Sequence, residues 1–114
     1  MKDNVYFVQS FTIDQSHKAR AFHEKIVETY GEDIFPIASA QGYDSAKLIL
    51  DAIKKVGLNS EDIRDQIESF TDFEGVTDIK PTPFTKDDHE AFGEDEVFLA
   101  EYNDDLEIVT AKLD

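Results

Sequence analysis

A helical pattern in the middle of the chain constrains its folding more than any other feature. Apolar residues recur there at three- and four-residue spacing, at Ala46, Ile49, Leu50, Ile53 and Val56. This spacing is that of one face of an α-helix. Lys54 and Lys55 precede Gly57, where positive charge favours the end of a helix. We therefore expect an amphipathic helix that begins near Gly42 and buries this apolar side.

Two shorter helical patterns flank this helix. The first can be capped by Ser16 and terminated by Gly31. Its apolar positions are Ala19, Phe22, Ile26 and Tyr30. The second follows a cap at Asn59 or Ser60. Its narrow apolar stripe consists of Ile63, Ile67 and Phe70. The sequence thus predicts three helices.

Extended segments are expected before, between and after these helices. Residues 5–8 form a β-branched and aromatic run that is typical of a buried strand. Residues 34–40 should be extended, because Pro36 biases Phe35 away from helical angles and lacks a donor. Residues 73–76 indicate a turn into an extended segment, and Pro81 and Pro83 make any strand there an edge strand or an irregular one.

The C-terminal part of the chain reads as a loop followed by a hairpin. Residues 86–96 are polar and acidic, which favours an exposed loop. Residues 97–102 and 106–109 have strand patterns on either side of the sequence Asn103-Asp104-Asp105. The whole chain, residues 1–114, is therefore expected to be one α/β domain with three helices, a small mixed sheet and a C-terminal β-hairpin.

Charge and composition exclude several classes of function. With 11 basic and 26 acidic residues the net charge is −15, which disfavours binding to nucleic acid and to anionic membranes. The absence of Cys excludes disulfides, Cys-based metal sites and thiol nucleophiles. There is no apolar run of membrane-spanning length, and residues 1–4 do not resemble a secretion signal.

The sequence contains no complete motif for catalysis or metal binding. His23 and Glu24 begin like a zinc-protease helix, but Val27 stands where the second His is required. The acidic run 87–93 fails as a calcium loop, because Phe92 and Leu99 occupy ligand positions. His17, His23 and His89 are expected at surface or helix-flanking positions. We expect no enzyme activity, no metal and no cofactor.

The central helix also carries a family resemblance. Residues 42–57, GYDSAKLILDAIKKVG, resemble the helix near the end of type 1 periplasmic solute-binding proteins of the branched-chain amino acid transporter group. The segments around it follow the order of that family, from the strand at 5–11 to the closing hairpin at 97–109. Two departures stand out: Lys86-Asp87-Asp88 with Gly93 replaces the usual Asp-x-x-Gly-Asp turn, and the upstream portion of the family is absent.

The resemblance implies a function and a set of site residues. The chain would be the C-terminal part of a periplasmic or extracellular receptor whose two lobes close on a small amino-acid-like ligand for an ABC permease. Ala38 aligns with a wall of the ligand pocket, with Ser39 and Tyr43 as neighbours, and the helix start at Gly42 could offer backbone donors. Packing roles for Ala38 and Tyr43 are the simpler alternative.

Two further expectations follow for the isolated chain. Apolar surface that the parent receptor buries would be exposed, which favours a homodimer or strand exchange. A stand-alone acidic α/β domain that contacts another protein, without binding a small molecule, is the alternative function.

Overall fold

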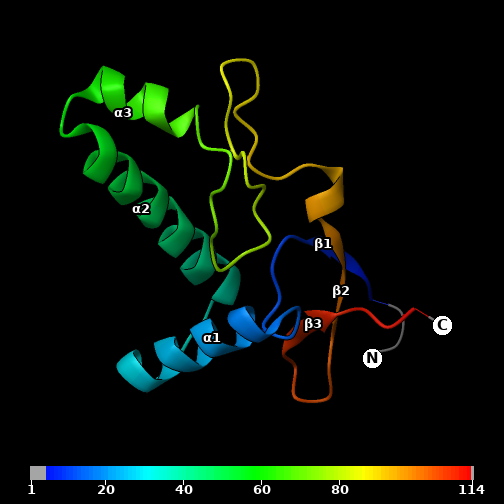
Figure 1. The fold of residues 1–114 in the computed structure, drawn as a ribbon. Helices are drawn as coiled ribbons and strands as arrows, with labels where there is room; N and C mark the ends of the chain where they lie inside the picture. The colour runs from blue at the N-terminus through cyan, green and yellow to red at the C-terminus, as the bar shows by residue number, and fades with distance from the viewer. Residues whose placement is uncertain (1–4, 114) are drawn as a thin grey trace.

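The computed structural model describes residues 5–113 as three helices followed by a loop-rich segment and a hairpin. The helices are α1 (His17–Tyr30), α2 (Pro36–Val56) and α3 (Ser60–Ile67), and a 3-10 turn, η1, spans Glu94–Glu96. The strands are β1 (Phe7–Gln9), β2 (Phe98–Tyr102) and β3 (Ile108–Thr110). The helices lie on one side of the molecule and the sheet on the other (Figure 1).

Helix α1 has the ends that its sequence predicts. The hydroxyl of Ser16 accepts a hydrogen bond from the backbone N–H of Ala19 at 3.1 Å. Gly31 adopts a left-handed conformation with φ of 87°, and its N–H donates to the carbonyl of Val27 at 2.8 Å. A residue without a side chain reaches this conformation at little cost. Of the predicted apolar positions Ala19 is buried, whereas Tyr30 is exposed.

Helix α2 is longer than its apolar pattern predicts. It begins at Pro36, so the expectation of an extended segment over residues 34–40 is wrong from Pro36 onward. Proline suits the first helical position, where its fixed φ is helical and its missing N–H is not needed. The restriction on the preceding residue does hold, since Phe35 caps the helix with φ of −138°. Gly42 therefore lies inside the helix.

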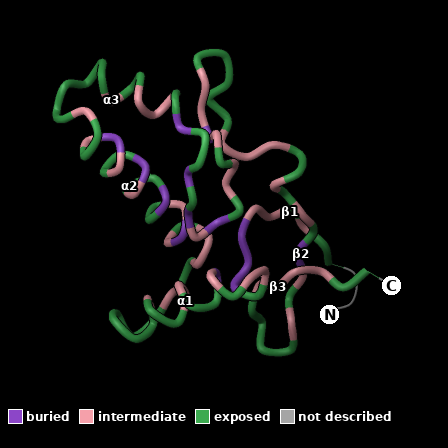
Figure 2. Tube along the Cα trace, viewed as in Figure 1, coloured by how far each residue is buried: buried purple, intermediate pink, exposed green. Residues whose placement is uncertain are grey.

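The buried side of α2 also differs from the expected one. Ala40, Asp44, Leu48 and Ala52 are buried. Ala46, Ile49 and Leu50, which were expected to face the core, are exposed. The loop at 70–79 and helix α3 cover only one side of α2, and Figure 2 shows the buried stretches of α2 alternating with exposed ones. The apolar side that defines the pattern is thus only partly covered, with Ile53 and Val56 half-buried.

Helix α3 packs as predicted. The side chain of Asn59 accepts hydrogen bonds from the N–H groups of Glu61 and Asp62 at 3.0 and 3.1 Å, which caps the helix. Ile63 and Ile67 are half-buried against a core cluster that consists of Leu48, Ala52, Phe70 and Phe73. This cluster joins α3 and the following loop to α2.

The sheet has three antiparallel strands in the order β1-β2-β3, so the expectation of a mixed sheet is wrong. Phe7 pairs with Ala100, and Ala100 pairs in turn with Thr110. The first strand starts two residues later than predicted. The C-terminal hairpin is confirmed, and the N–H of Asn103 donates to the carbonyl of Glu107 at 3.0 Å across its turn.

The segment from residue 68 to residue 93 contains no helix or strand. The prolines allowed an edge strand or an irregular one there, and the segment is irregular throughout. It is attached to α2 through Asp44, whose buried carboxylate accepts hydrogen bonds from the N–H groups of Val76 and Thr77 and from the hydroxyl of Thr77, at 2.7, 3.0 and 2.5 Å. Gly75 approaches this carboxylate so closely that a Cβ there would overlap it. The loop position therefore depends on a residue without a side chain.

The described part of the chain is elongated. Its radius of gyration is 16.1 Å and its extents are 51 × 33 × 19 Å, whereas a compact domain of about this length has a radius of about 13 Å. Two separate clusters form the interior. One lies along α2 and α3. The other joins Phe11, Ile13, Ala19 and Ala40 where the sheet meets the helices.

Candidate functional site

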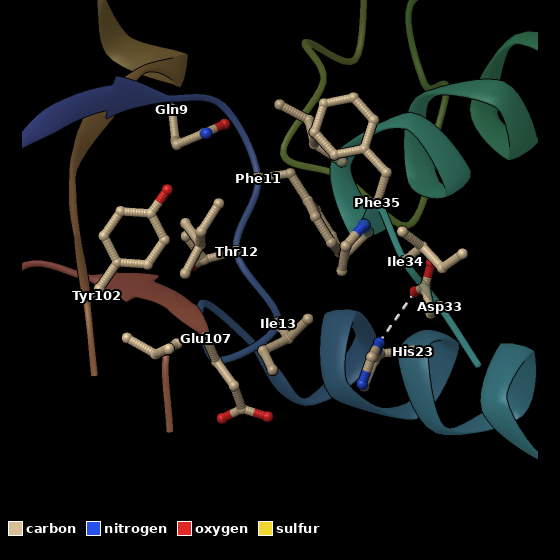
Figure 3. A pocket seen from close by; sticks show the side chains of 14 residues that line it. Gln9, Phe11, Thr12, Ile13, His23, Asp33, Ile34, Phe35, Tyr102 and Glu107 are labelled. Carbon is tan, nitrogen blue, oxygen red and sulfur yellow. Dashed lines mark hydrogen bonds and ion pairs between the residues drawn. The ribbon is translucent and has the colours of Figure 1, made fainter. Parts of the chain in front are cut away.

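A cavity of about 270 Å³, here named the inner cavity, lies between the sheet and the first turn of α2 (Figure 3). The strand end at 9–13, the segment 33–37 and the β2–β3 hairpin surround it. Its apolar walls include Phe11, Ile13, Phe35, Ile37 and Ile108. Its polar groups belong to Gln9, Thr12, His23, Asp33, Tyr102 and Glu107. An apolar cavity with a few polar groups is the usual form of a small-molecule site.

One side of the inner cavity is fixed by a hydrogen-bonded group of three residues. The buried carboxylate of Asp33 bonds to Nδ1 of His23 at 2.9 Å and accepts from the hydroxyl of Ser39 at 2.6 Å. The three residues come from the connection between the helices, from α1 and from the first turns of α2. Because the hydroxyl bonds to the carboxylate and not to the imidazole, the group is not a nucleophilic triad, which needs a base on the hydroxyl. It joins the two helices.

The ionisable residues that line the inner cavity are two carboxylates and the imidazole of His23, which is paired with Asp33. Asp33 and Glu107 line it, and no Lys or Arg does. One carboxylate oxygen of Glu107 accepts a hydrogen bond from the side-chain amide of Asn103 at 2.9 Å. The side chains of Gln9 and Tyr102 make no hydrogen bond within the described residues, so their polar groups are available to a ligand.

A second hollow, here named the outer groove, lies on the other side of the segment 33–35 and measures about 440 Å³. Phe22, Ile26 and Tyr30 of α1 line it, together with Ser39 and Tyr43 of α2. The rings of Phe22 and Tyr43 are 5.2 Å apart, a distance typical of a stabilising aromatic pair. Tyr43 is still half exposed. The outer groove is thus a formed surface that is open on one side.

The structure places the predicted site residues in different surroundings. Ser39 and Tyr43 meet in the outer groove, whereas Ala38 is exposed on α2 and lines neither hollow. The expectation of free donors at Gly42 is wrong, because that residue is inside α2 and the helix begins at Pro36. The first turn of α2 lies beside the inner cavity instead.

Sequence reasoning missed the polar residues of the inner cavity. Gln9, Asp33, Tyr102 and Glu107 come from segments up to about a hundred residues apart, and no local pattern marks them. His23 was weighed as a metal ligand and expected instead at a surface or helix-flanking position. The pairing of β1 with β2 brings these groups together, and a strand pattern does not name its partner strand.

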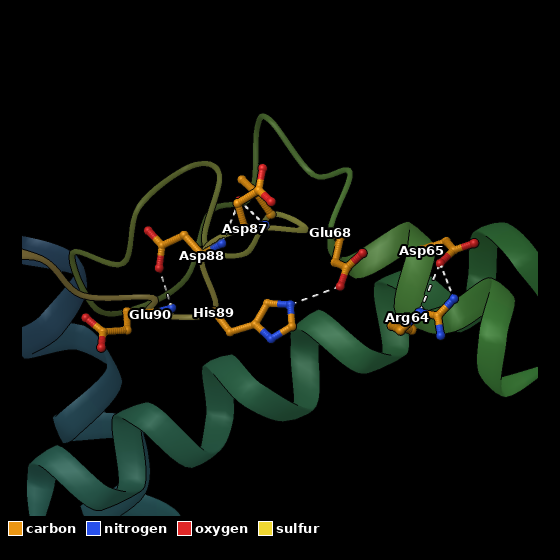
Figure 4. Close-up of polar contacts among 8 residues, drawn as sticks. Arg64, Asp65, Glu68, Asp87, Asp88, His89 and Glu90 are labelled. Atoms are coloured by element: carbon orange, nitrogen blue, oxygen red, sulfur yellow. Dashed lines mark hydrogen bonds and ion pairs between the residues drawn. The ribbon is translucent and has the colours of Figure 1, made fainter.

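The acidic loop at 87–90 is held by contacts of its own rather than by a calcium-loop geometry (Figure 4). The N–H of Glu90 donates to Asp88 at 2.8 Å and lowers the pKa of the Asp88 carboxyl, because the bond stabilises the charged form. His89 Nε2 lies 2.9 Å from a carboxylate oxygen of Glu68 and attaches the loop to the end of α3. On α3 itself, the hydrogen bond to Asp65 raises the pKa of Arg64.

Two features of residues 5–113 bear on other functions. Within this range, no three His, Cys, Asp or Glu side chains are grouped as metal ligands would be. None of the helices described is long and apolar enough to cross a membrane.

Comparison with known proteins assigns the family. The profile of the periplasmic binding proteins matches residues 2–106, which is most of the chain. No curated protein and no solved structure matches it. Because one profile accounts for the helices, the loop and the first strand of the hairpin, the chain belongs to the periplasmic binding protein family, whose members bind solutes for transport and are typically not enzymes.

Proposed function

We infer that the chain is a single domain that forms the C-terminal part of a two-lobed solute receptor of the branched-chain amino acid group. The receptor captures a small amino-acid-like ligand by lobe closure and delivers it to an ABC permease, in the periplasm or outside the cell. The match of the family profile to residues 2–106 carries this proposal.

The form of the outer groove supports it. A receptor that closes on its ligand presents half of the site on each lobe, so each half alone is open to solvent. Ser39 and Tyr43 line such an open surface, and Ala38 is exposed on the same two turns of α2. In this proposal the three side chains form one wall, and most of the polar contacts come from the opposite lobe.

The uncovered apolar surface supports it as well. Ile49 and Leu50 are 46% and 55% exposed on the side of α2 that its sequence pattern would bury. A contiguous exposed apolar surface often marks a place where another surface binds. A second lobe would supply that cover.

Calorimetry tests the proposal with two proteins, the complete receptor that contains this chain and the chain alone. Titration with a panel of aliphatic amino acids should give binding to the complete receptor and none to the chain alone. Ala38→Trp in the receptor should abolish binding by filling the wall. Ala46→Trp is the matched control, because it makes the same change at an exposed position of the same helix.

Three results would count against the proposal. Tight amino acid binding by the chain alone would contradict a site divided between two lobes. Equal effects of Ala38→Trp and Ala46→Trp on amino acid binding would show that Ala38 is not part of the ligand wall. The complete receptor could also bind no amino acid while the chain alone binds a protein partner. The chain would then be better described as a stand-alone protein-interaction domain.

A further inference from the structure

The hydrogen bonds of the sheet show which backbone groups point toward its two edges. Between β2 and β3, the N–H of Asn103 donates to the carbonyl of Glu107 at 3.0 Å. The N–H of Ala111 donates to the carbonyl of Leu99 at 2.9 Å. In an antiparallel ladder such bonded pairs recur at every second residue. The odd-numbered residues of β2 therefore direct their N–H and C=O toward β3, and the even-numbered ones direct theirs toward β1.

This alternation leaves the backbone of Val8 unpaired at the edge that β1 forms. Phe7 is the register partner of Ala100, an even-numbered residue, so Phe7 bonds to β2. Its neighbour Val8 then directs its N–H and C=O away from the sheet. Within residues 5–113, no other group bonds to these two atoms of Val8. Val8 is also 66% exposed, so this edge is open to another strand.

The opposite edge, along β3, is blocked by a side chain. Thr110 is the register partner of Ala100 and therefore directs its N–H away from β2. This N–H donates to the carboxylate of Asp14 at 3.0 Å. The Thr110 hydroxyl lies 3.0 Å from the hydroxyl of the buried Thr12. Asp14 thus takes the place that the carbonyl of an added strand would have, and a charged side chain on an edge prevents such pairing.

The sequence of the β1 edge suits a second copy of this chain. Residues 5–13 contain no charged side chain, although the whole chain has 26 acidic and 11 basic residues. Like charges opposite each other on neighbouring strands destabilise a sheet. Two copies that meet along this segment oppose no charges, whereas contact over most of the remaining surface brings acidic groups together. A charged peptide from another protein would find no counter-charge there.

We propose that two copies of the chain associate through β1, with their Val8 residues opposite each other at a twofold axis. Antiparallel pairing of identical strands is self-complementary, and at this register the two Val8 residues exchange both of their N–H···O=C bonds. The two sheets become one sheet of six strands. Because Asp14 blocks the β3 edge of each copy, the assembly closes as a dimer and does not grow into a fibre.

This inference goes beyond the expectation that exposed apolar surface favours association. It specifies the contact, the register and the number of copies. It is also independent of the receptor proposal, because it uses neither the outer groove nor a ligand.

Disulfide cross-linking with oxidised glutathione tests the register, because the chain has no Cys of its own. Bonded residues of an antiparallel pair have Cα atoms about 5.5 Å apart, within the range of a disulfide. Val8→Cys should therefore give a covalent dimer. Leu99→Cys is the matched control, since Leu99 is exposed and is the register partner of Val8 on the central strand. In the dimer about 14 Å, three strand spacings, separates the two Leu99 residues, so this variant should not cross-link.

Sedimentation velocity of two lysine variants separates the edge from the face of the sheet. Val8→Lys places like charges opposite each other at the twofold axis and should raise the dimer dissociation constant about fivefold or more. Leu99→Lys makes the same change on the same face, farther from the axis than the screening length in physiological salt. It should change the constant less than about twofold. Asp14→Ala should allow assemblies larger than a dimer, because it opens the second edge.

Four outcomes would overturn the proposal. The original chain could stay monomeric at millimolar concentration, or the two Cys variants could cross-link equally, as random encounter would produce. Equal effects of Val8→Lys and Leu99→Lys would place the contact on the sheet face and not on the edge. An Asp14→Ala variant that stays dimeric would show that Asp14 does not close the assembly. The amide NMR spectrum of each variant checks that the fold is retained. The receptor proposal is unaffected by these results, since it is tested with amino acids and a second lobe.

Discussion

At the residue scale, the contact between Gly75 and Asp44 is the most sensitive point of the fold. A Cβ at Gly75 would overlap the Asp44 carboxylate, which holds the loop through three hydrogen bonds. Gly75→Ala should therefore lower the free energy of unfolding by about 2 kcal/mol or more. Urea denaturation measures this.

Gly42 provides the matched control for that substitution. It lies inside α2, and a Cβ there would meet nothing within 4 Å. Gly42→Ala should raise the free energy of unfolding by about 0.5–1 kcal/mol, because alanine loses less chain entropy in a helix. If both variants shift stability in the same direction, the close approach at Gly75 is not what holds the loop.

Asp44 itself should be intolerant of an isosteric change. Asn has one acceptor oxygen where the carboxylate has two, so Asp44→Asn places an N–H₂ group against backbone donors. The expected loss in unfolding free energy is about 1–3 kcal/mol. Asp65→Asn is the comparison, since Asp65 forms an exposed pair with Arg64, and such pairs contribute about 1 kcal/mol or less. Equal effects in urea denaturation would contradict the role of Asp44.

At the scale of the element, α2 contains a charged network that makes its stability depend on pH. The hydrogen bond from Lys47 at 2.6 Å lowers the pKa of Asp51, with Lys54 contributing. A lowered pKa means that the folded state favours the charged carboxylate. The stabilisation is therefore complete above the unfolded pKa of about 3.9 and is lost as the pH falls through the folded value.

Asp51→Asn tests this dependence. The variant should be less stable than the original chain at neutral pH, and the difference in urea midpoint should shrink as the pH falls through the lowered pKa of Asp51, below which both lack the charge. Glu24→Gln, at an exposed position of α1, should show no such convergence. A difference that stays constant with pH would mean that Asp51 acts through packing and not through charge.

At the scale of the whole molecule, the elongated shape leaves apolar surface for association. Val8 and Leu99 are register partners on neighbouring strands, and both are exposed. We expect the chain to self-associate more at high salt, because salt screens the repulsion between copies that each carry −15. Sedimentation velocity at low and high salt measures this.

The variant Val8→Thr/Leu99→Thr should weaken self-association, since Thr retains the strand preference without the apolar surface. Leu58→Thr removes an exposed apolar side chain outside the sheet and should have little effect. A chain that stays monomeric at high salt would contradict this use of the sheet face.

The sequence by itself determined the features that depend on neighbouring residues. The cap at Ser16, the helix end at Gly31 and the C-terminal hairpin were predicted, and the cap at Asn59 was one of two candidates, because a cap or a turn uses groups only a few residues apart. The same holds for the irregular segment around Pro81 and Pro83. Membership in the family was also indicated by sequence alone.

Only the tertiary structure decided which surfaces meet. It buried Asp44 and exposed Ile49, because the loop at 70–79 covers a side of α2 that hydrophobicity does not mark. It also extended α2 back to Pro36 and paired β1 with β2, which formed the inner cavity. Such contacts join residues far apart in the chain, and a pattern read along the chain carries no information about the surface that will cover it.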